Sequence, residues 1–264
     1  MTVITLTTDF GLRDPFVGAM KGVILAINRR VHLVDLTHEV RPHDILEGAL
    51  ALEAAAGFFP PGTIHLAVVD PGVGTARRAL GVNAGGQLFV GPDNGLFTFL
   101  FARPGWSAVS LEGAAYRLAE VSPTFHGRDV FAPAAAYLSL GVPLRRFGPE
   151  VGDPVTIAWP AARQEGDAVV GEVVHIDRFG NLATSIRAAD LSPLGPDASL
   201  AVEVEGVVVS GLSAAYAERS AGALGAIVGS SSRLELFVRD GSARDRFGLG
   251  RGTRVTVRKR GGPA

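Results

Sequence analysis

The chain has 264 residues, of which 47% are hydrophobic and 19% charged, and its formal net charge is −1. This composition excludes a disordered chain, and the length is enough for one large domain or two ordinary ones. The charge balance gives no support to nucleic acid or an anionic membrane surface as a partner. The chain has no cysteine, which excludes disulfides, thiolate metal sites and a cysteine nucleophile.

The beginning of the sequence gives an expectation about location. Residues 1–7 lack the basic segment of a signal peptide and have the pattern of a strand. No run of about 18 apolar residues occurs, so we expect no membrane-spanning helix. The sequence therefore predicts a cytoplasmic globular protein.

The first part of the sequence alternates between strand and helix patterns. Short runs rich in β-branched residues predict strands at residues 3–8, 31–36 and 64–69. Apolar residues at helical spacing predict two helices between these strands, the first opened by Asp14 as N-cap and the second by residues 43–45. This order predicts a right-handed, largely parallel sheet with helices on both faces.

Further elements complete a first domain that we expect to span residues 1–155. They are a hairpin at 80–90 around Gly85-Gly86, a turn at 92–95, a helical segment at 96–101, a strand at 116–121 and a helix at 134–140. The domain is thus predicted to be an α/β domain that carries the catalytic residues.

The pattern changes after Gly148. Prolines and polar residues predict a linker, which we place at residues 156–168. Period-two alternation then predicts strands at 169–176, 200–209, 226–228, 234–238 and 254–258. We expect residues 169–264 to form a smaller antiparallel all-β domain, a barrel or a sandwich, that completes the site.

A turn with charged residues follows the predicted strand at 64–69. Asp70 stands at the carboxyl end of this strand, where ligands of open α/β sheets lie. Gly72 and Gly74 permit positive φ angles and the close approach of a ligand, and Arg77 supplies a guanidinium. By itself, Asp-Pro-Gly is also typical of a tight turn with solvated arginines.

Polar residues follow other predicted strands as well. The pairs at these turns are Asp9 and Asp14, His38 and His43, Asp70 and Arg77, Asp93 and Asn94, and His126 and Asp129. One such turn is typical of a helix cap, but five at one sheet edge favour a polar ligand site. His126 is expected to be exposed enough for proton transfer. Histidine spacings of metal motifs and Gly-rich phosphate loops are missing, so we expect no metal, nucleoside triphosphate or NAD.

Two segments of the second domain each have two interpretations. Residues 176–182 are typical of a hairpin turn, or of a purine site with a stacking Phe179 and a pairing Asn181. Residues 229–233 are typical of a loop, or of a site where serine hydroxyls bind a carboxylate. Neither pattern is specific alone.

Six blocks in this order resemble the S-adenosyl-L-methionine hydroxide adenosyltransferases, relatives of the adenosyl fluorinase and chlorinase. The blocks are Thr7-Thr8-Asp9-Phe10-Gly11 with Asp14, Val69-Asp70-Pro71-Gly72-Val73-Gly74 with Arg77, Pro92-Asp93-Asn94-Gly95, Thr124-Phe125-His126-Gly127-Arg128-Asp129, Ile176-Asp177-Arg178-Phe179-Gly180-Asn181 and Leu234-Glu235. The resemblance runs nearly from end to end.

The resemblance implies that Asp70, Arg77 and His126 form the catalytic set that acts on water, with adenosine and L-methionine as products. In the halogenases, the positions of Asp70 and His126 are occupied by other residues, so the complete set favours hydroxide transfer. The family members are trimers whose sites lie between the N-terminal domain of one subunit and the C-terminal domain of its neighbour. We therefore expect a homotrimer that acts on a small molecule without a cofactor.

The resemblance also implies a set of substrate-binding residues. The expected partners are the ribose hydroxyls for Asp9, the methionine ammonium for Asp14 and Asp177, adenine for Phe179 and Asn181, and the methionine carboxylate for Ser230 and Ser231. Phe125 and Asn94 are assigned to substrate binding without a specified partner.

One block departs from the family, and two alternatives remain open. The family usually has Asn-Ser-Ser-Gly-Tyr before Leu-Glu, where this chain has residues 229–233, Gly-Ser-Ser-Ser-Arg. The alternatives are a halide-using synthase, which forms 5′-halogenated adenosine, and a non-catalytic protein that binds adenosine or S-adenosylmethionine. The complete set of Asp70, Arg77 and His126 argues against both.

Overall fold

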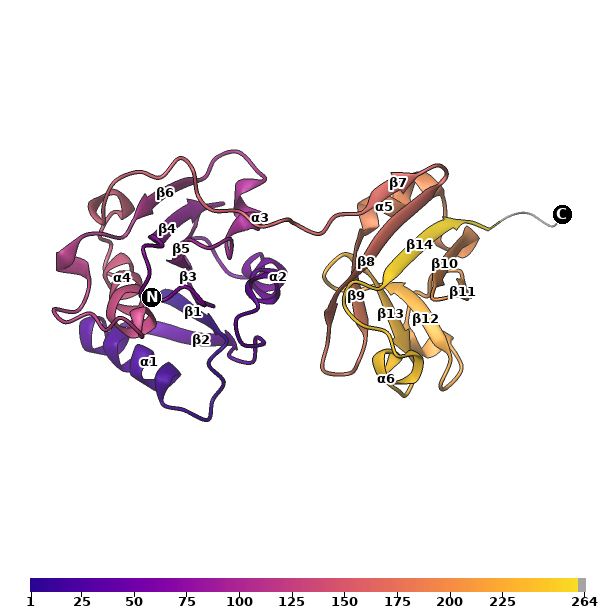
Figure 1. Ribbon diagram of the computed structural model, residues 1–264, viewed down its shortest axis with the longest axis horizontal. Helices are drawn as coiled ribbons and strands as arrows, with labels where there is room; N and C mark the ends of the chain where they lie inside the picture. Colours follow the sequence, from indigo (N-terminus) through magenta and orange to yellow (C-terminus); the bar gives the residue numbers. More distant parts are fainter. Residues whose placement is uncertain (261–264) are drawn as a thin grey trace. The chain divides into compact units, whose positions relative to one another are not determined.

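A computed structural model describes residues 1–260 and divides into two compact units at Trp159 and Pro160 (Figure 1). This division falls within the segment predicted as a linker, residues 156–168. The second domain was predicted to span residues 169–264, of which residues 261–264 lie outside the described part.

The first unit is an α/β domain with a six-stranded sheet. Its strands are β1 (Thr2–Thr8), β2 (Val31–Thr37), β3 (Ile64–Val68), β4 (Ala79–Ala84), β5 (Gln87–Pro92) and β6 (Ser107–Ser110). Its helices are α1 (Phe16–Ile27), α2 (Ile45–Ala56), α3 (Thr98–Phe101) and α4 (Ala132–Ser139), the last preceded by a π-helical turn at Gly127–Phe131. The strand order is β2-β1-β3-β5-β4-β6.

The sheet is mixed rather than purely parallel. The neighbours β2, β1, β3 and β5 run parallel, whereas β4 is antiparallel to both β5 and β6. The predicted hairpin causes this reversal, since Gly85 and Gly86 turn the chain with φ angles of 58° and 79°. The carboxyl ends of β1, β2, β3 and β5 consequently share one edge of the sheet.

Helices cover both faces of this sheet, as the alternation of strands and helices predicts. On one face, Ile4 and Leu6 of β1 pack with residues of α1 and α4, among them Met20 and Ile24. On the other face, Ala49 and Leu52 of α2 belong to a second cluster. The central strands are buried on both faces, which explains their continuous apolar runs.

A histidine lies inside the second cluster. His65 of β3 is fully buried, hydrogen-bonds Thr5 Oγ1 through Nδ1 at 2.8 Å and stacks on Phe89 with 4.7 Å between the ring centroids. Burial lowers the pKa of His65 to about 4, because the charged ring loses its hydration. The domain therefore keeps this ring neutral.

We expect acid to destabilise the protein through His65. The unfolded chain binds a proton at this residue below about pH 6.5, whereas the folded chain does so only near pH 4. This contribution to stability is fully present above pH 6.5 and is lost as pH falls toward 4, by about 2 kcal/mol at pH 5. Denaturant unfolding at pH 7.5 and pH 5 measures it. His65→Gln should show a smaller difference between the two pH values, and an equal difference would contradict the assignment.

Two predictions about this domain are wrong in detail. Asp14 does not cap α1, because Pro15 occupies the N-cap position and its carbonyl accepts the hydrogen bond from Ala19 N at 2.9 Å. The strand predicted at 116–121 is also missing. Tyr116 ends a 3-10 turn instead, and its ring packs on Phe147 with 4.4 Å between centroids. The short strand β6 was not predicted.

The second unit is an antiparallel β domain, as predicted. Its strands are β7 (Arg163–Glu165), β8 (Ala168–Ile176), β9 (Leu182–Arg187), β10 (Leu200–Val204), β11 (Val207–Ser210), β12 (Leu224–Val228), β13 (Arg233–Val238) and β14 (Arg254–Lys259). Two short helices, α5 (Ala188–Leu191) and α6 (Ala243–Phe247), accompany them. The order is β11-β10-β14-β8-β9-β13-β12, and β7 pairs with β8.

The described strands curl toward closure. Ser213, after β11, donates its backbone N–H to the carbonyl of Ala226 in β12 at 2.8 Å, which links the two ends of the strand order. Apolar residues on the inner side form one core, among them Val173, Leu182, Val202, Leu236 and Val257.

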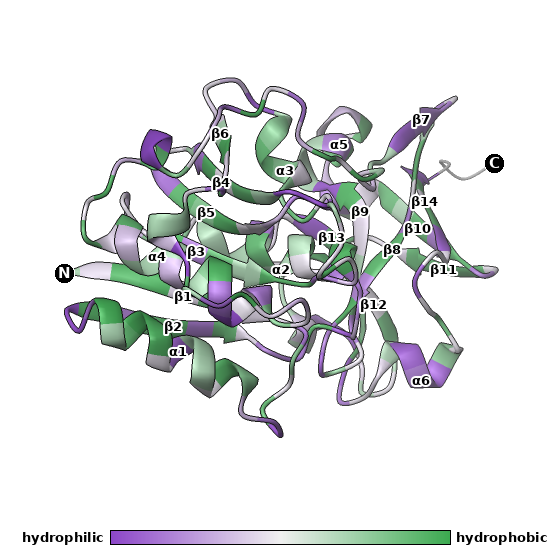
Figure 2. Ribbon diagram, turned by 60° about the vertical axis from the view of Figure 1, so that its left-hand side comes forward, coloured by the Kyte–Doolittle hydropathy of each residue, from purple (hydrophilic) through white to green (hydrophobic). Residues whose placement is uncertain are grey.

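The sequence misjudged three details of this domain. The strand predicted at 200–209 is two strands, because Glu205 and Gly206 adopt positive φ angles and turn the chain. Strand β9 was not predicted. Strand β7 lies within the predicted linker; its three residues are exposed and hydrophilic, purple in Figure 2, so their composition resembles that of a loop.

Across residues 1–260, none of the helices is both long and apolar enough to cross a lipid bilayer.

Candidate active site

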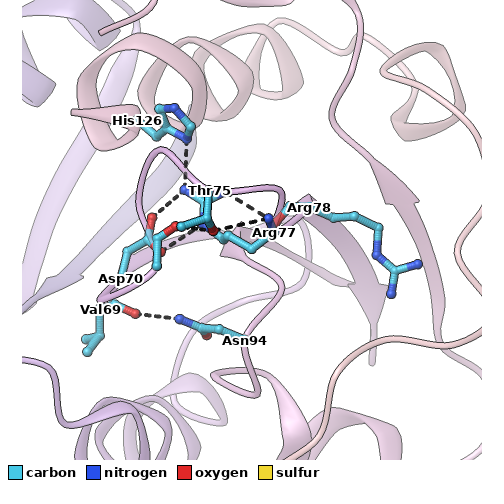
Figure 3. Close-up of polar contacts among 8 residues, drawn as sticks. Val69, Asp70, Thr75, Arg77, Arg78, Asn94 and His126 are labelled. Carbon is cyan, nitrogen blue, oxygen red and sulfur yellow. Dashed lines mark hydrogen bonds and ion pairs between the residues drawn. The ribbon is translucent and has the colours of Figure 1, made fainter. Parts of the chain in front are cut away.

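Asp70, Arg77 and His126 meet at the carboxyl end of β3. Arg77 lies between the other two, as Figure 3 shows. Its Nε donates to Asp70 Oδ1 at 2.8 Å, its Nη2 donates to Asp70 Oδ2, and the same Nη2 lies 2.8 Å from His126 Nδ1. The side chains of Asp70 and Arg77 are only 4% and 10% exposed, so solvent screens this pair weakly.

The contact with Arg77 fixes the proton position on His126. A guanidinium donates hydrogen bonds and accepts none, so Nδ1 of His126 is the acceptor. The ring is then neutral, with its proton on Nε2. Burial lowers the pKa of His126, and the charge of Arg77 lowers it further. His126 therefore presents an N–H donor on its far side.

His126 reaches this position by a route that the sequence did not predict. The expected strand at 116–121 does not exist, and His126 instead precedes the π-helical turn at Gly127–Phe131 that leads into α4. Such turns are rare and often occur at functional sites. The guanidinium of Arg77 lies over the ring of Phe131, 5.2 Å from its centroid, which adds a third side to its enclosure.

The turn after Asp70 is fixed by its own hydrogen bonds. Thr75 Oγ1 donates to the carbonyl of Gly72 at 2.7 Å and accepts from Arg77 N at 3.3 Å. Gly74 has a φ of 77°, and a Cβ there would overlap the carbonyl oxygen of Pro123. The sequence suggested positive φ at both glycines to admit a ligand. In the structure Gly72 is not in that region, and Gly74 makes room for the chain that carries His126.

Asn94 and Asp93 hold the backbone near Asp70. Asn94 Nδ2 donates to the carbonyl of Val69, directly before Asp70, at 2.8 Å (Figure 3). Asp93 is buried and accepts from Arg78 Nε at 2.7 Å and from Val155 N at 2.8 Å. The side chains of this block thus fasten the end of β3 and the segment near Val155.

Asp9 lies one strand away from Asp70. The parallel register pairs Thr8 with Val68, so the chain leaves β1 and β3 side by side. Asp9 Oδ2 accepts from the backbone N of His43 at 2.8 Å, which ties its loop to the start of α2. Asp14 is exposed on the loop before α1.

The other two predicted histidines have structural contacts. His38 is buried, and its Nδ1 shares a hydrogen bond of 2.8 Å with Thr8 Oγ1. Its Nε2 lies 3.0 Å from Asp35 Oδ1. His43 adopts a φ of 69° and contributes its backbone N–H to Asp9. Within residues 1–260, no group of three or more potential ligand side chains is arranged to hold a metal.

Phe125 belongs to an aromatic cluster that the sequence did not single out. Its ring contacts Phe16 and Phe10, with 5.3 Å and 6.0 Å between ring centroids. The guanidinium of Arg128 lies 5.1 Å from the centroid of the Phe125 ring. Phe16 is 44% exposed, so the cluster forms part of the domain surface beside His126.

In the second domain, Asp177, Phe179 and Asn181 line one cavity of about 630 Å³ together with Tyr216 and Phe237. Phe179 is 75% exposed. The cavity therefore joins an accessible aromatic ring to a carboxylate and a carboxamide, which suits a flat, polar-edged ligand.

Tyr216 and Glu235 were not predicted as site residues. Tyr216 Oη donates to Glu235 Oε1 at 2.7 Å; this hydrogen bond, with burial, raises the pKa of Tyr216 to about 12. Burial also raises the pKa of Glu235. Tyr216 lies in a 3-10 turn between β11 and β12, where no sequence motif marks it.

Ser230 and Ser231 are exposed on the loop between β12 and β13 and are not among the residues that line this cavity. In the same loop, Ser232 has a φ of 57°. Arg233, which departs from the family pattern, is 4% exposed and donates to the carbonyl of Thr184 at 3.3 Å. Its side chain thus supports the strands of the domain.

Both domains match family models. The model of the SAM hydroxide adenosyltransferase N-terminal domain matches residues 4–148, and that of the C-terminal domain matches residues 171–256. A crystal structure of a protein from Thermotoga maritima is similar, with a TM-score of 0.90 and 32% identity, and the match covers 98% of this chain and 100% of that one.

The named relatives divide into two groups. A protein from Salinispora tropica is 41% identical over 96% of this chain and 97% of its own length, and one from Thermus thermophilus is 42% identical over 97% and 100%. Both are named (R)-S-adenosyl-L-methionine hydrolase. A fluorinase from Nocardia brasiliensis is more distant, at 27% identity over 86% of this chain and 85% of its own length. The chain belongs to the SAM hydroxide adenosyltransferase family.

Proposed function

We infer that this protein is an enzyme that hydrolyses S-adenosyl-L-methionine to adenosine and L-methionine. The observation that carries the inference is the contact of Arg77 with both Asp70 and His126 at a strand end. The names of the relatives support the same reaction, since hydrolases of this substrate are 38–44% identical over most of the chain, whereas the fluorinases are 27–28% identical.

The reaction is an in-line displacement at the ribose C5′. A bond forms between the water oxygen and C5′ while the C5′–S bond breaks, and its electron pair stays on sulfur. The leaving group is a neutral thioether, so it needs no proton and no general acid. The nucleophile is the difficult part of this reaction.

Energetics exclude a hydroxide ion made beforehand by Asp70 alone. Water has a pKa of about 15.7 and a carboxylic acid about 4, so the transfer costs roughly 16 kcal/mol. The whole barrier for one turnover per second is about 17 kcal/mol. Removal of the proton during the attack avoids this cost. Asp70 accepts the proton as the C–O bond forms, and the second water proton stays on the new 5′-hydroxyl.

Arg77 and His126 position the water in this scheme. Arg77 holds the Asp70 carboxylate in one orientation, and the Nε2–H of His126 is a donor to the oxygen that gains negative charge. His126 is therefore a hydrogen-bond donor to the nucleophile rather than its general base. The sulfonium charge disappears as the bond forms, so a dry pocket favours the attack.

The pH dependence of kcat tests this role of His126. The pKa of His126 is lowered, so the ring stays neutral to a lower pH than an ordinary histidine. We expect kcat to fall only when Nδ1 gains a proton and can no longer accept from Arg77. The His126→Asn variant keeps an acceptor for Arg77 and does not titrate, so its acid limb should move to lower pH. A His126-dependent limb with a midpoint above pH 6.5 would contradict the assignment.

The other predicted site residues remain proposals. We propose the ribose hydroxyls for Asp9, the methionine ammonium for Asp14 and Asp177, adenine for Phe179 and Asn181, and the methionine carboxylate for Ser230 and Ser231. We also propose Phe125 and Asn94 as residues of the substrate site, a homotrimer as the assembly, and the cytoplasm as the location. Operation without metal or cofactor is part of the same proposal.

Incubation of the purified protein with S-adenosylmethionine tests the function directly. Chromatography should show adenosine and methionine in equal amounts above a buffer blank. A parallel incubation in concentrated chloride distinguishes the hydrolase from a halide-using synthase, because a chloride-using synthase would form 5′-chloro-5′-deoxyadenosine. Binding of the substrate without any product would indicate a non-catalytic binding protein instead.

A further inference from the structure

We propose that Asp177 is a positioning residue for substrate selection: it fixes the carboxamide of Asn181 in the orientation that accepts a 6-amino purine and rejects a 6-oxo purine. The proposal rests on the proposed function, in which the substrate carries adenine. It gives Asp177 a second role, in addition to the proposed contact with the methionine ammonium.

The loop from Asp177 to Asn181 is closed by its own hydrogen bonds. Asp177 N donates to the carbonyl of Asn181 at 3.0 Å, and Asp177 Oδ1 accepts from the backbone N–H groups of Phe179 and Asn181 at 2.8 and 2.9 Å. Gly180 has a φ of 83°, and a Cβ there would overlap Ser242, next to α6. The loop therefore has little freedom to change its shape.

The second oxygen of Asp177 determines the orientation of the Asn181 side chain. Asn181 Nδ2 donates to Asp177 Oδ2 at 3.0 Å. An ionised carboxylate only accepts hydrogen bonds, so the amide must turn its NH₂ group toward Asp177 and its Oδ1 away. Asn181 then presents Oδ1 as an acceptor and its second N–H as a donor to a ligand, and the positions of the two groups are fixed.

This order of acceptor and donor selects among purines. Adenine carries an amine at position 6 beside N7, a ring nitrogen that accepts hydrogen bonds. This donor and this acceptor match the oxygen and the N–H of a carboxamide. Hypoxanthine carries an oxygen at position 6 beside N7, so both of its groups are acceptors. Its oxygen would face Oδ1 of Asn181, and this contact between two acceptors would be repulsive. The exposed ring of Phe179 lines the same cavity of about 630 Å³ and supplies a stacking face.

The three hydrogen bonds that Asp177 accepts all come from its own loop. They use most of the acceptor capacity of the carboxylate, which has about four lone-pair sites. This is the expected arrangement of a residue that orients a neighbour, and it distinguishes Asp177 from the exposed carboxylate of Asp245, whose Oδ1 lies 3.8 Å from Arg244 Nε.

The Asp177→Asn variant should reverse the Asn181 amide. The oxygen of the new side chain can keep the two backbone hydrogen bonds, which leaves its NH₂ group facing Asn181. Two NH₂ groups repel each other, so Asn181 turns its oxygen toward position 177 and presents donor and acceptor in the opposite order. The change removes base selection while it retains the loop.

The test compares kcat/KM for S-adenosylmethionine with that for its 6-oxo analogue, in which hypoxanthine replaces adenine. The wild-type protein should prefer the 6-amino substrate by roughly 10- to 100-fold, the range for one bidentate amide pair. The ratio should fall at least tenfold in Asp177→Asn. Asp245→Asn, which removes the charge of an exposed carboxylate that is not among the residues lining the cavity, should leave the ratio unchanged.

The outcomes separate the two proposals. If the wild-type protein turns over neither substrate, the proposed function fails, and calorimetric binding of adenosine against inosine still tests the pocket. An unchanged preference in Asp177→Asn overturns the inference, and a raised KM for both substrates together with that result indicates contact with the amino-acid part. If Asp177→Asn does not fold, Asp177→Ser, whose hydroxyl retains a turn-forming acceptor, provides the same comparison.

Discussion

Replacement of Asp70 by alanine should lower kcat about a thousandfold, the middle of the range for a general base, and should leave KM nearly unchanged. In the proposed mechanism Asp70 acts on the water rather than on a substrate group, and both of its oxygens accept hydrogen bonds from Arg77. Steady-state kinetics with S-adenosylmethionine measures the effect. Asp70→Asn keeps the size of the side chain but cannot accept the proton at neutral pH, so it should lose as much turnover.

Stability and a neighbouring ion pair provide the controls for this experiment. The Arg77 side chain is 10% exposed, so the loss of its carboxylate should also destabilise the fold by about 3–5 kcal/mol. Kinetics are therefore measured well below the melting temperature of the variant. Asp153→Ala removes the 85% exposed carboxylate from Arg78 and should leave stability and turnover nearly unchanged, because solvent screens this pair. A large rise in KM with unchanged kcat in Asp70→Ala would contradict the assigned role.

Replacement of Gly74 by alanine should damage both activity and stability. Its φ of 77° is strained for any residue with a Cβ, at about 1–3 kcal/mol, and the new methyl group would overlap the carbonyl oxygen of Pro123. The turn that carries Arg77 must then move away from the segment that carries His126. A displacement of about 1 Å in a catalytic group can cost a hundredfold in rate, so we expect kcat to fall roughly that much.

Gly72→Ala is the matched control, because it adds the same methyl group two residues earlier. Its backbone is outside the positive φ region, and the new Cβ would meet Arg77 Cγ and Thr75 Oγ1 at 3.6 Å, an ordinary van der Waals distance. We expect kcat and the free energy of unfolding to change little. Equal losses in the two variants, measured by kinetics and denaturant unfolding, would show that the Pro123 contact is not the cause.

The site shows where sequence patterns succeed and where they stop. Asp70 and Arg77 lie seven residues apart on one turn, and a strand followed by Asp-Pro-Gly predicts their position well. His126 was expected at the end of a strand, but it precedes a π-helical turn. The structure brings His126 to Arg77 by another local route than the predicted strand. The loop before it is closed by a hydrogen bond from Leu118 N to the Asp129 carbonyl at 2.9 Å, and such a loop has no periodic sequence pattern.

Polar residues in turns are the hardest to interpret from sequence. Asn94 follows a strand, as ligand-binding residues often do, and its amide also donates to the Val69 carbonyl, which the sequence did not predict. Asp177 resembles a free carboxylate, yet it accepts three hydrogen bonds from its own loop. A sequence gives the donors and acceptors of a side chain, and only the folded backbone determines which of them are already used.

The sequence by itself determined the features that depend on near neighbours: the strand and helix periods of both domains, the hairpin at Gly85-Gly86, and the presence of a carboxylate, a guanidinium and an imidazole in turns. Tertiary structure decided that Arg77 lies between Asp70 and His126, that Nε2 of His126 carries the proton, and that Tyr216 joins the cavity of Phe179. The contact between Arg77 and His126 joins residues 49 positions apart. Their geometry depends on the packing of whole elements, which local residue preferences do not contain.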